Sequence, residues 1–193
     1  MTLRLLVALA GVAGCVSYSG GARPVDPARV NEPGWIVAGV ARETRQQGSY
    51  DCGAASLAMV ASRWNVPLSL AGATAGLPKP TEQGVPLGDL RDLARARGLT
   101  AFAIAGDQAT LVHELRAGRP VIVGLHLPYG GKRVFSHYEV IVAVHPGEAR
   151  FVTIDPASGW RSRTWAELDA EWKPAGRPTL VVLGRANYAA VLD

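Results

Sequence analysis

The chain has 193 residues, of which 48% are hydrophobic and 19% are charged, and its formal net charge is +4. This length suits one domain with a full hydrophobic core, and the composition excludes a disordered chain and a multi-span membrane protein. The positive charge comes mostly from scattered arginines, with no long basic run and no aromatic-and-basic stripe. We therefore expect no nucleic-acid partner.

Residues 1–14 are predicted to be a signal peptide rather than part of the fold. Arg4 is followed by an apolar run that is far shorter than the ~20 residues of a membrane-spanning helix. The run ends in Val12-Ala13-Gly14-Cys15, which resembles the lipobox of bacterial lipoproteins. The resemblance implies cleavage before Cys15 and diacylation of this cysteine, which anchors the mature chain to a membrane. A plain secretory signal with an incidental Cys15 is the alternative.

The chain contains two cysteines, Cys15 and Cys52. If Cys15 carries lipid, Cys52 has no disulfide partner, and an unpaired thiol in an exported protein indicates reactivity. A disulfide between the two cysteines is the alternative, and it requires that the lipobox is not used. Residues 15–34 are predicted to form the lipidated cysteine and a flexible tether, because Ser, Gly, Pro and Arg dominate from Val16 to Asn31.

The folded domain is predicted over residues 35–185, with residues 186–193 as a C-terminal tail. A short strand is expected at 35–40, and a helix begins at Cys52 and ends before Pro67. Apolar residues at helical spacing predict further helices at 68–77, 88–97, 108–117 and 165–172. Val- and Ile-rich runs predict strands at 100–105, 120–127, 137–144, 151–155 and 179–184. Because helices come first and strands later, we expect an α+β fold.

Cys52 occupies the position expected of a thiol nucleophile. It opens a predicted helix, whose unpaired N–H groups and positive dipole end favour thiolate over thiol. Thiolate is the reactive form. Cys52 also lies between the polar Asp51 and the small Gly53, and Gly53 leaves room for a substrate backbone. A buried cysteine that acts only as a small hydrophobic residue is the alternative.

His137 is predicted to be the general base, with Asp155 as the carboxylate that orients it. His137 is expected to begin a strand after a flexible loop at 129–132, which lets its ring face a cleft, and His126 is the second choice. Asp155 ends the next predicted strand, across a hairpin turn from His137, so the two side chains can meet. A carboxylate on the second ring nitrogen fixes the tautomer and stabilises the imidazolium.

Gln46 is the predicted oxyanion donor. It lies six residues before Cys52, from where its amide N–H can reach back to a developing oxyanion, and Gln47 is the alternative. No cofactor is expected. We also expect no metal site, because two cysteines and four scattered histidines show no ligand spacing.

The stretch from Gln46 to Met59, with its Asp-Cys-Gly, resembles the active-site segment of the bacteriocin-processing, double-glycine leader peptidase family. Residues 137–142 and 155–159 resemble that family's histidine strand and Asp-Pro turn, and residues 81–90 resemble the stretch before its second helix. The likeness covers roughly Trp35 to Gly184. It implies a papain-like fold, with a helical half and an antiparallel sheet, and cleavage after Gly-Gly or a similar small pair.

Many members of that family are N-terminal domains of export transporters that also carry a nucleotide-binding domain. Nothing in this sequence resembles a phosphate-binding loop. We therefore expect no ATP binding, and we expect any export machinery to be a separate protein. In the lipoprotein family, Asp after the cysteine retains the protein at the inner membrane. Val16 at this position favours the outer membrane, facing the periplasm, if the source is Gram-negative.

The leading hypothesis is a membrane-anchored cysteine peptidase that acts on a peptide or protein substrate. Cys52 attacks the peptide carbonyl with His137 as its base, Asp155 orients the ring, and Gln46 and the Cys52 backbone N–H hold the oxyanion. An amidase or a transglutaminase-like enzyme with the same triad is the second hypothesis. An inactive, lipid-anchored binding module is the third, although all four site residues are present.

Overall fold

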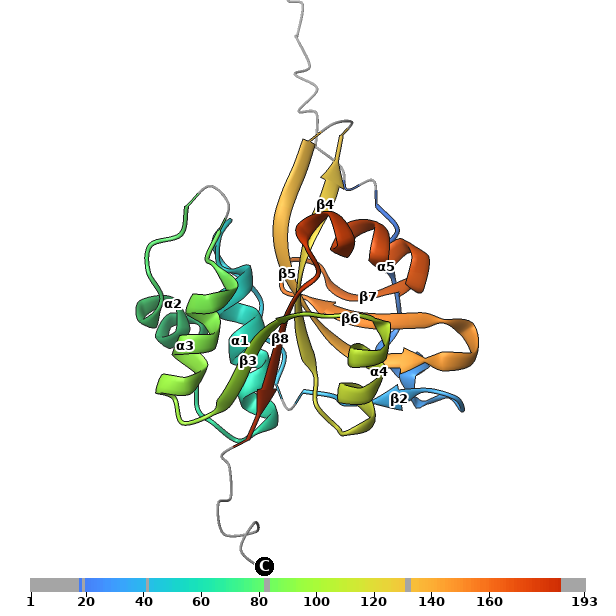
Figure 1. Cartoon of the computed structure of the whole chain (residues 1–193), viewed down its shortest axis with the longest axis horizontal. Helices are drawn as coiled ribbons and strands as arrows, with labels where there is room; N and C mark the ends of the chain where they lie inside the picture. Colours follow the sequence, from blue (N-terminus) through green and yellow to red (C-terminus); the bar gives the residue numbers. More distant parts are fainter. Residues whose placement is uncertain (1–17, 19, 41, 82–83, 131–132, 185–193) are drawn as a thin grey trace, which may run out of the picture.

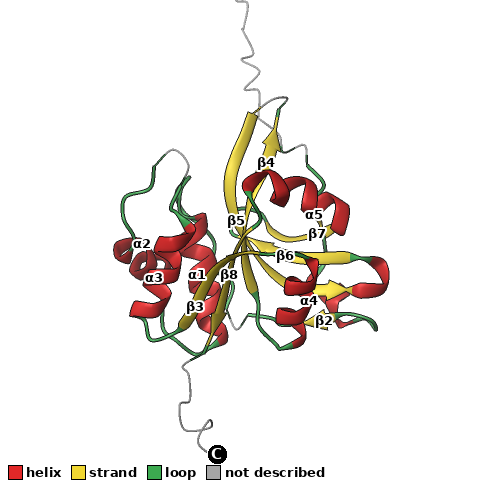
Figure 2. Cartoon of the chain, in the orientation of Figure 1, coloured by secondary structure: helices red, strands yellow, loops and turns green. Residues whose placement is uncertain are grey.

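The structure, a computed structural model, describes residues 18, 20–40, 42–81, 84–130 and 133–184. Figure 2 shows one group of helices beside a strongly twisted sheet, and further helices on the other side of that sheet. The predicted α+β class is confirmed, because the first four α-helices precede the long strands of the sheet. No helix in these ranges is long and apolar enough to cross a membrane.

Three helices form a helical lobe: α1 (Cys52–Arg63), α2 (Leu70–Gly76) and α3 (Leu87–Ala96) (Figure 1). Every residue from 52 to 61 of α1 is buried, because this small and apolar helix lies between the sheet and the other two helices. The predicted helices at 68–77 and 88–97 are confirmed, and their ends differ by only one or two residues.

One antiparallel sheet lies beside the helical lobe. Its strands follow the order β1-β7-β6-β5-β4-β8-β3, and β2 pairs separately with β5. The strands are β1 (Arg23–Pro24), β2 (Ile36–Val37), β3 (Thr100–Ala105), β4 (Val121–Tyr129), β5 (Arg133–His145), β6 (Arg150–Asp155), β7 (Gly159–Thr164) and β8 (Pro178–Leu183). The remaining helices are α4 (Gln108–Arg116), α5 (Trp165–Trp172) and the short 3-10 helices η1 (Pro27–Asn31), η2 (Pro146–Glu148) and η3 (Lys173–Ala175).

Hydrophobic cores lie on both faces of the sheet. The first core joins the sheet to α1–α3, and the second joins it to α4 and α5. Along β5, Val140 and Val142 enter the first core, whereas Ile141 and Val144 enter the second. A strand that is buried on both faces has a continuous apolar sequence, which is the pattern that β5 shows.

Two strand predictions need correction. β5 begins at Arg133, so His137 lies inside a strand rather than at its start, because the β4–β5 hairpin continues its hydrogen-bonded ladder beyond the core. β7 was not predicted, because the expected turn covered 155–159 and no element was assigned between it and the helix at 165. Its polar side chains suggest a loop, yet Ser162 and Arg163 are buried where β7 pairs with β6.

The predicted flexible tether is also wrong for the part that the structure describes. Tyr18 makes a β-bridge with Tyr129, β1 pairs with β7, and η1 begins at Pro27. Ala22 and Val30 are buried, and Val30 belongs to the first hydrophobic core. The domain therefore begins well before residue 35. The predicted signal peptide (1–14), Cys15 and the tail (186–193) lie outside the described residues.

Candidate active site

Cys52 is the first residue of α1, and its relative exposure is only 5%. Burial by itself raises the pKa of its thiol. A hydrogen bond with the His137 ring, the charge of that ring, and the backbone N–H groups of Tyr138 and Gly53 outweigh burial and lower the pKa below its ordinary value. The site therefore stabilises thiolate at the N-terminus of a helix.

The His137 ring lies between the thiol and a carboxylate. Its Nε2 is 2.7 Å from Oδ1 of Asp155, so Nε2 donates to the carboxylate and Nδ1 is left for the sulfur of Cys52. Burial by itself lowers the pKa of His137, but the hydrogen bonds and charges of Asp155 and Cys52 raise it to about 10. The protonated ring is therefore the stable form at neutral pH.

The Asp155 carboxylate accepts hydrogen bonds from the turn that follows it as well as from His137. Its Oδ1 accepts the Ala157 N–H at 2.7 Å, and its Oδ2 accepts the hydroxyl of Ser158. Burial raises the pKa of this carboxyl, but the hydrogen bond and charge of His137 and the two turn donors lower it far below its ordinary value. Asp155 is thus ionised, and the turn after β6 fixes its direction.

The pairing of β5 with β6 explains why these side chains meet. Val140 pairs with Ile154, so one further antiparallel step sets Asp155 opposite Glu139. His137 is then the diagonal neighbour of Asp155 on the same face of the sheet, within reach of its carboxylate.

Gln46 lies in the loop before α1, next to the Asp155 turn. Its backbone N–H donates to the Pro156 carbonyl at 3.1 Å, and its side chain lines a pocket beside His137, whereas Gln47 is exposed. The Gln46 side-chain N–H donates to the Gly48 carbonyl at 3.1 Å, and its Oε1 is buried without a hydrogen-bond partner. The amide nitrogen carries two hydrogens, so its second N–H remains as a donor for an oxyanion.

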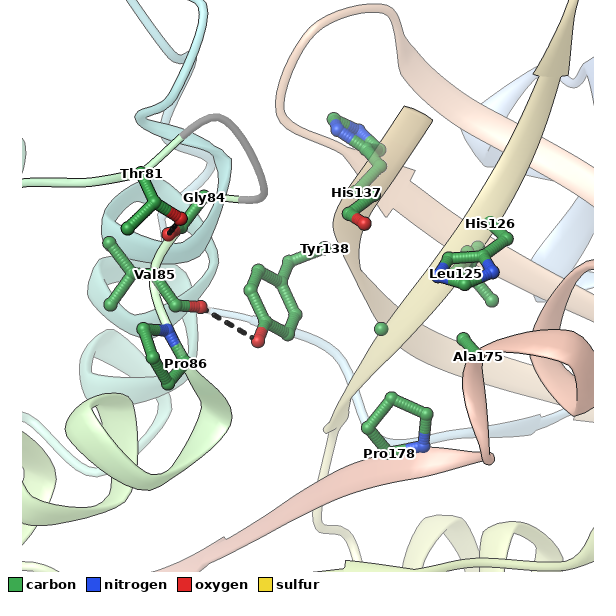
Figure 3. Close-up of a pocket in the computed structure, with 12 residues that line it drawn as sticks. Thr81, Gly84, Val85, Pro86, Leu125, His126, His137, Tyr138, Ala175 and Pro178 are labelled. Carbon is green, nitrogen blue, oxygen red and sulfur yellow. Dashed lines mark hydrogen bonds between the residues drawn. The ribbon is translucent and has the colours of Figure 1, made fainter. Parts of the chain in front are cut away.

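Pockets flank His137 on two sides. One, of about 270 Å³, lies between the helical lobe and the sheet and is lined by Val85, Pro86 and Pro178 (Figure 3). The other, of about 310 Å³, is lined by Leu127 and Phe135. A peptide chain bound across Cys52 can therefore extend into a pocket on either side of the imidazole.

His126, the second choice of base, lines only the first of these pockets. It lies on β4, where it pairs with Ser136 rather than with His137. Figure 3 shows His126 to the right of β4 and Tyr138 to its left, and the Tyr138 hydroxyl donates to the Val85 carbonyl at 2.9 Å. The histidine at the thiol is His137.

Behind Asp155 lies a buried ion cluster that the sequence analysis did not foresee. Arg163 donates to both carboxylate oxygens of Glu139 at 2.7 Å, and its Nε donates to Glu171 at 2.7 Å. All three side chains are almost fully buried. Glu171 also accepts the Tyr18 hydroxyl and, at 2.9 Å, the Gly21 N–H. The N-terminal segment thus completes a charge cluster next to the site.

The Glu139 carboxylate lies near His137, but its hydrogen bonds go to the ion cluster. Ligand atoms of His137, Glu139 and Asp155 lie within 4.8 Å of one another, a grouping that sequence spacing does not reveal. Arg163 and the Thr153 hydroxyl, at 2.6 Å, occupy the Glu139 carboxylate, and Asp155 is paired with His137. Asp155 is therefore the carboxylate that orients the ring, and we still expect no metal here.

The sequence that builds this site matches a known enzyme family. The sequence model of the Peptidase C39 family matches residues 42–176, which contain all four predicted site residues of the domain. The chain belongs to this family. It is therefore a cysteine peptidase, as predicted, and the C39 match spans the helical lobe, most of the sheet and all the residues named here as lining the pockets except Pro178. No curated protein matches this C39 peptidase.

Solved structures agree with the C39 assignment at the level of the fold. A double-glycine-motif protease from an AMS/PCAT transporter, in complex with the leader peptide, is 21% identical with a TM-score of 0.60, over 77% of this chain and 96% of that one. The peptidase domain of Streptococcus ComA, a bi-functional ABC transporter, is 24% identical with a TM-score of 0.60, over 73% and 96%. A C39-like peptidase from Bacillus anthracis is 15% identical with a TM-score of 0.63, over 78% and 98%. The predicted papain-like fold is confirmed.

Proposed function

We propose that this C39 peptidase cleaves peptide bonds with Cys52 as nucleophile, His137 as general base and acid, and Asp155 as the orienting carboxylate. The observation that carries the proposal is the continuous hydrogen-bonded chain from the Cys52 thiol through the His137 ring to Oδ1 of Asp155, at 2.7 Å from Nε2. The lowered thiol pKa and the raised imidazole pKa support a thiolate–imidazolium pair before substrate binds.

The reaction then follows from these atoms. The Cys52 sulfur attacks the carbonyl carbon, and the Cys52 backbone N–H and the Gln46 amide hold the oxyanion. As the C–N bond breaks, imidazolium His137 gives its proton to the leaving amine, and a thioester remains on the sulfur. Water, deprotonated by His137, attacks the thioester, which releases the carboxylic acid and restores the thiolate. Asp155 keeps Nδ1 of the ring directed at the sulfur throughout.

We also propose that the substrate is an exported peptide, cut after a Gly-Gly-type leader. Family membership supports this choice, as do two of the similar structures, which are peptidase parts of transporters; one of them is a double-glycine-motif protease with bound leader peptide. The two pockets beside His137 offer room for substrate residues on both sides of the scissile bond.

Peptide cleavage tests both parts of this function. Wild type and Cys52→Ala are incubated with a precursor peptide whose leader ends in Gly-Gly and is followed by a cargo segment, and with a matched precursor that has Val-Val in place of Gly-Gly. We expect wild type to cut only the first peptide, after the second glycine, and Cys52→Ala to cut neither. Release of ammonia from an amide, or amine transfer, without peptide cleavage would instead favour the amidase or transglutaminase hypothesis. Tight peptide binding without any turnover would indicate the inactive binding module.

A third proposal concerns location. We propose that Cys15 is lipidated and that the enzyme acts on a membrane surface of the bacterial envelope, facing the periplasm from the outer membrane in a Gram-negative source, where a separate export machinery delivers its substrate. The lipobox-like Val12-Ala13-Gly14-Cys15 supports the anchor. Detergent-phase partitioning of wild type, but not of Cys15→Ser, is the expected result. Wild type in the aqueous phase would contradict the anchor.

A further inference from the structure

The β4–β5 hairpin carries an exposed apolar tip. Val134 and Phe135, on β5, are 57% and 56% exposed, more than any other large hydrophobic residue in the described part of the chain. The ring of Tyr129, on β4, packs edge-on against Phe135 with centroids 5.1 Å apart. Figure 1 shows this hairpin projecting beyond the rest of the sheet. Such exposure of adjacent apolar residues on a projecting element indicates a contact surface.

The N-terminal segment joins the domain at the same hairpin. Tyr18 makes a β-bridge with Tyr129, and the two rings lie 5.8 Å apart. The Tyr18 hydroxyl is fixed by Glu171 and accepts the Ala22 N–H at 2.9 Å. Cys15 precedes Tyr18 by only three residues, which span at most about 11 Å when fully extended. Any acyl chain on Cys15 therefore starts close to the exposed tip.

We infer that Tyr18, Tyr129, Val134 and Phe135 form a membrane-contact surface that enters the interfacial layer of the bilayer. The inference rests on the proposed lipidation of Cys15, and it adds a fixed orientation to that anchor. Apolar side chains near a lipid anchor gain from burial in the acyl boundary, which lies about 5–10 Å below the headgroups. Tyr129 suits the same depth, because its ring is apolar and its hydroxyl polar, whereas Tyr18 offers only its ring, since Glu171 holds its hydroxyl.

Val134 distinguishes a bilayer from a peptide as the partner of this tip. Successive residues of a strand point to opposite faces, and of these two only Phe135 lines the pocket beside His137. A substrate in that pocket would cover Phe135 and leave Val134 in water. A bilayer covers both faces of a projecting hairpin. Because Tyr129 and Phe135 belong to both the surface and the pocket, the substrate pocket adjoins the membrane.

A single fluorophore in each of two matched positions tests this orientation. The background is the full chain with Cys52→Ser, in which Cys15 is the only native cysteine left. Either Val134→Cys or Phe102→Cys then accepts an environment-sensitive thiol label. Phe102 is the control, because it is 47% exposed on β3, at the far end of the strand order from β1. The labelled proteins are reconstituted into phosphatidylethanolamine–phosphatidylglycerol vesicles that carry a quencher in the acyl chains.

We expect the label at position 134 to emit at shorter wavelength and to be quenched by the lipid, and the label at position 102 to stay unchanged. If the Cys52→Ser protein is in the vesicles and resists thiol labelling, Cys15 is blocked by lipid. Equal behaviour of the two labels in that case would overturn the contact surface and leave the anchor intact. A labelled Cys15, or protein outside the vesicles, would overturn both proposals. A blue-shifted label at position 134 without vesicles would overturn the surface by showing that protein covers the tip. Dependence of that shift on protein concentration would identify a second copy.

Discussion

At the scale of single residues, Cys52 and His137 act as one electrostatic unit. Each partner favours the charged form of the other, so the pKa of the thiol falls while the pKa of the imidazole rises. Asp155 adds to the second effect from the far side of the ring. The reactive ion pair therefore exists over the range between the lowered thiol pKa and the raised imidazole pKa.

The pH dependence of kcat/KM is expected to follow this pair. Activity rises as the thiol ionises, and falls as His137 loses its proton near its pKa of about 10. Asp155→Asn removes an interaction that raises that pKa, so the alkaline limb should move to lower pH and the rate should fall without vanishing. Glu148→Gln, an exposed change of equal charge, is the control. An alkaline limb that stays in place in Asp155→Asn would show that another group orients the ring.

Gln46 and Gln47 form a natural matched pair for the oxyanion role. Only Gln46 lines the pocket beside His137. We expect Gln46→Ala to lower kcat by roughly 10²–10³ with little change in KM, because the amide stabilises charge that forms only in the transition state. Gln47→Ala should keep kcat near the wild-type value. Steady-state kinetics on the Gly-Gly peptide decide the matter, and a loss confined to Gln47→Ala would move the role to that residue.

At the scale of elements, the pairing of β5, β6 and β7 sets two acidic side chains next to one histidine. Glu139 and Asp155 lie on the same face, and both are buried. Arg163, supplied by β7, neutralises Glu139 with two hydrogen bonds and binds Glu171 with a third. Like charges this close are unfavourable in a buried site without such a partner, so β7 is needed for the electrostatics of the site as well as for the core.

Arg163→Met should therefore be costly. It leaves Glu139 and Glu171 buried without their cation, and we expect the free energy of unfolding to fall by about 3–5 kcal/mol. Adding Glu139→Gln should restore part of the loss, because one unpaired charge is removed. Arg161→Met, on the same strand but only half-buried, should cost much less. Urea unfolding followed by tryptophan fluorescence measures all three, and equal stability of the Arg163 and Arg161 variants would contradict a role for the cluster.

At the scale of the whole molecule, the N-terminal segment is part of the domain rather than a spacer. Tyr18 and Gly21 donate to Glu171, Ala22 and Val30 are buried, and β1 extends the sheet at β7. The chain between a lipidated Cys15 and the first fixed residue is then very short. Under this anchoring, the domain is held against the membrane in one orientation instead of moving on a long tether.

Tyr18→Phe tests whether this segment is attached in solution. The change removes a hydrogen bond to a buried carboxylate, so we expect the free energy of unfolding to fall by about 1.5–3 kcal/mol. Tyr50→Phe is the control, since Tyr50 is exposed at 45%. Thermal and urea unfolding of both variants provide the measurement. Unchanged stability in Tyr18→Phe would return the segment to the flexible tether that its composition predicts.

The sequence by itself determined the α+β class, the positions of most helices and strands, and the family. These follow from local signals: small and apolar residues at helical spacing after Cys52, Val-rich runs around His137, and the order of the Gln, Cys, His and Asp blocks. Only the tertiary structure decided that β7 is a strand, that Glu139 lies beside His137, and that residues from Tyr18 onward belong to the domain. The physical reason is the same in each case. Arg163 and Tyr18 are buried by partners distant in the sequence, and no local periodicity records a charge that is neutralised from another strand.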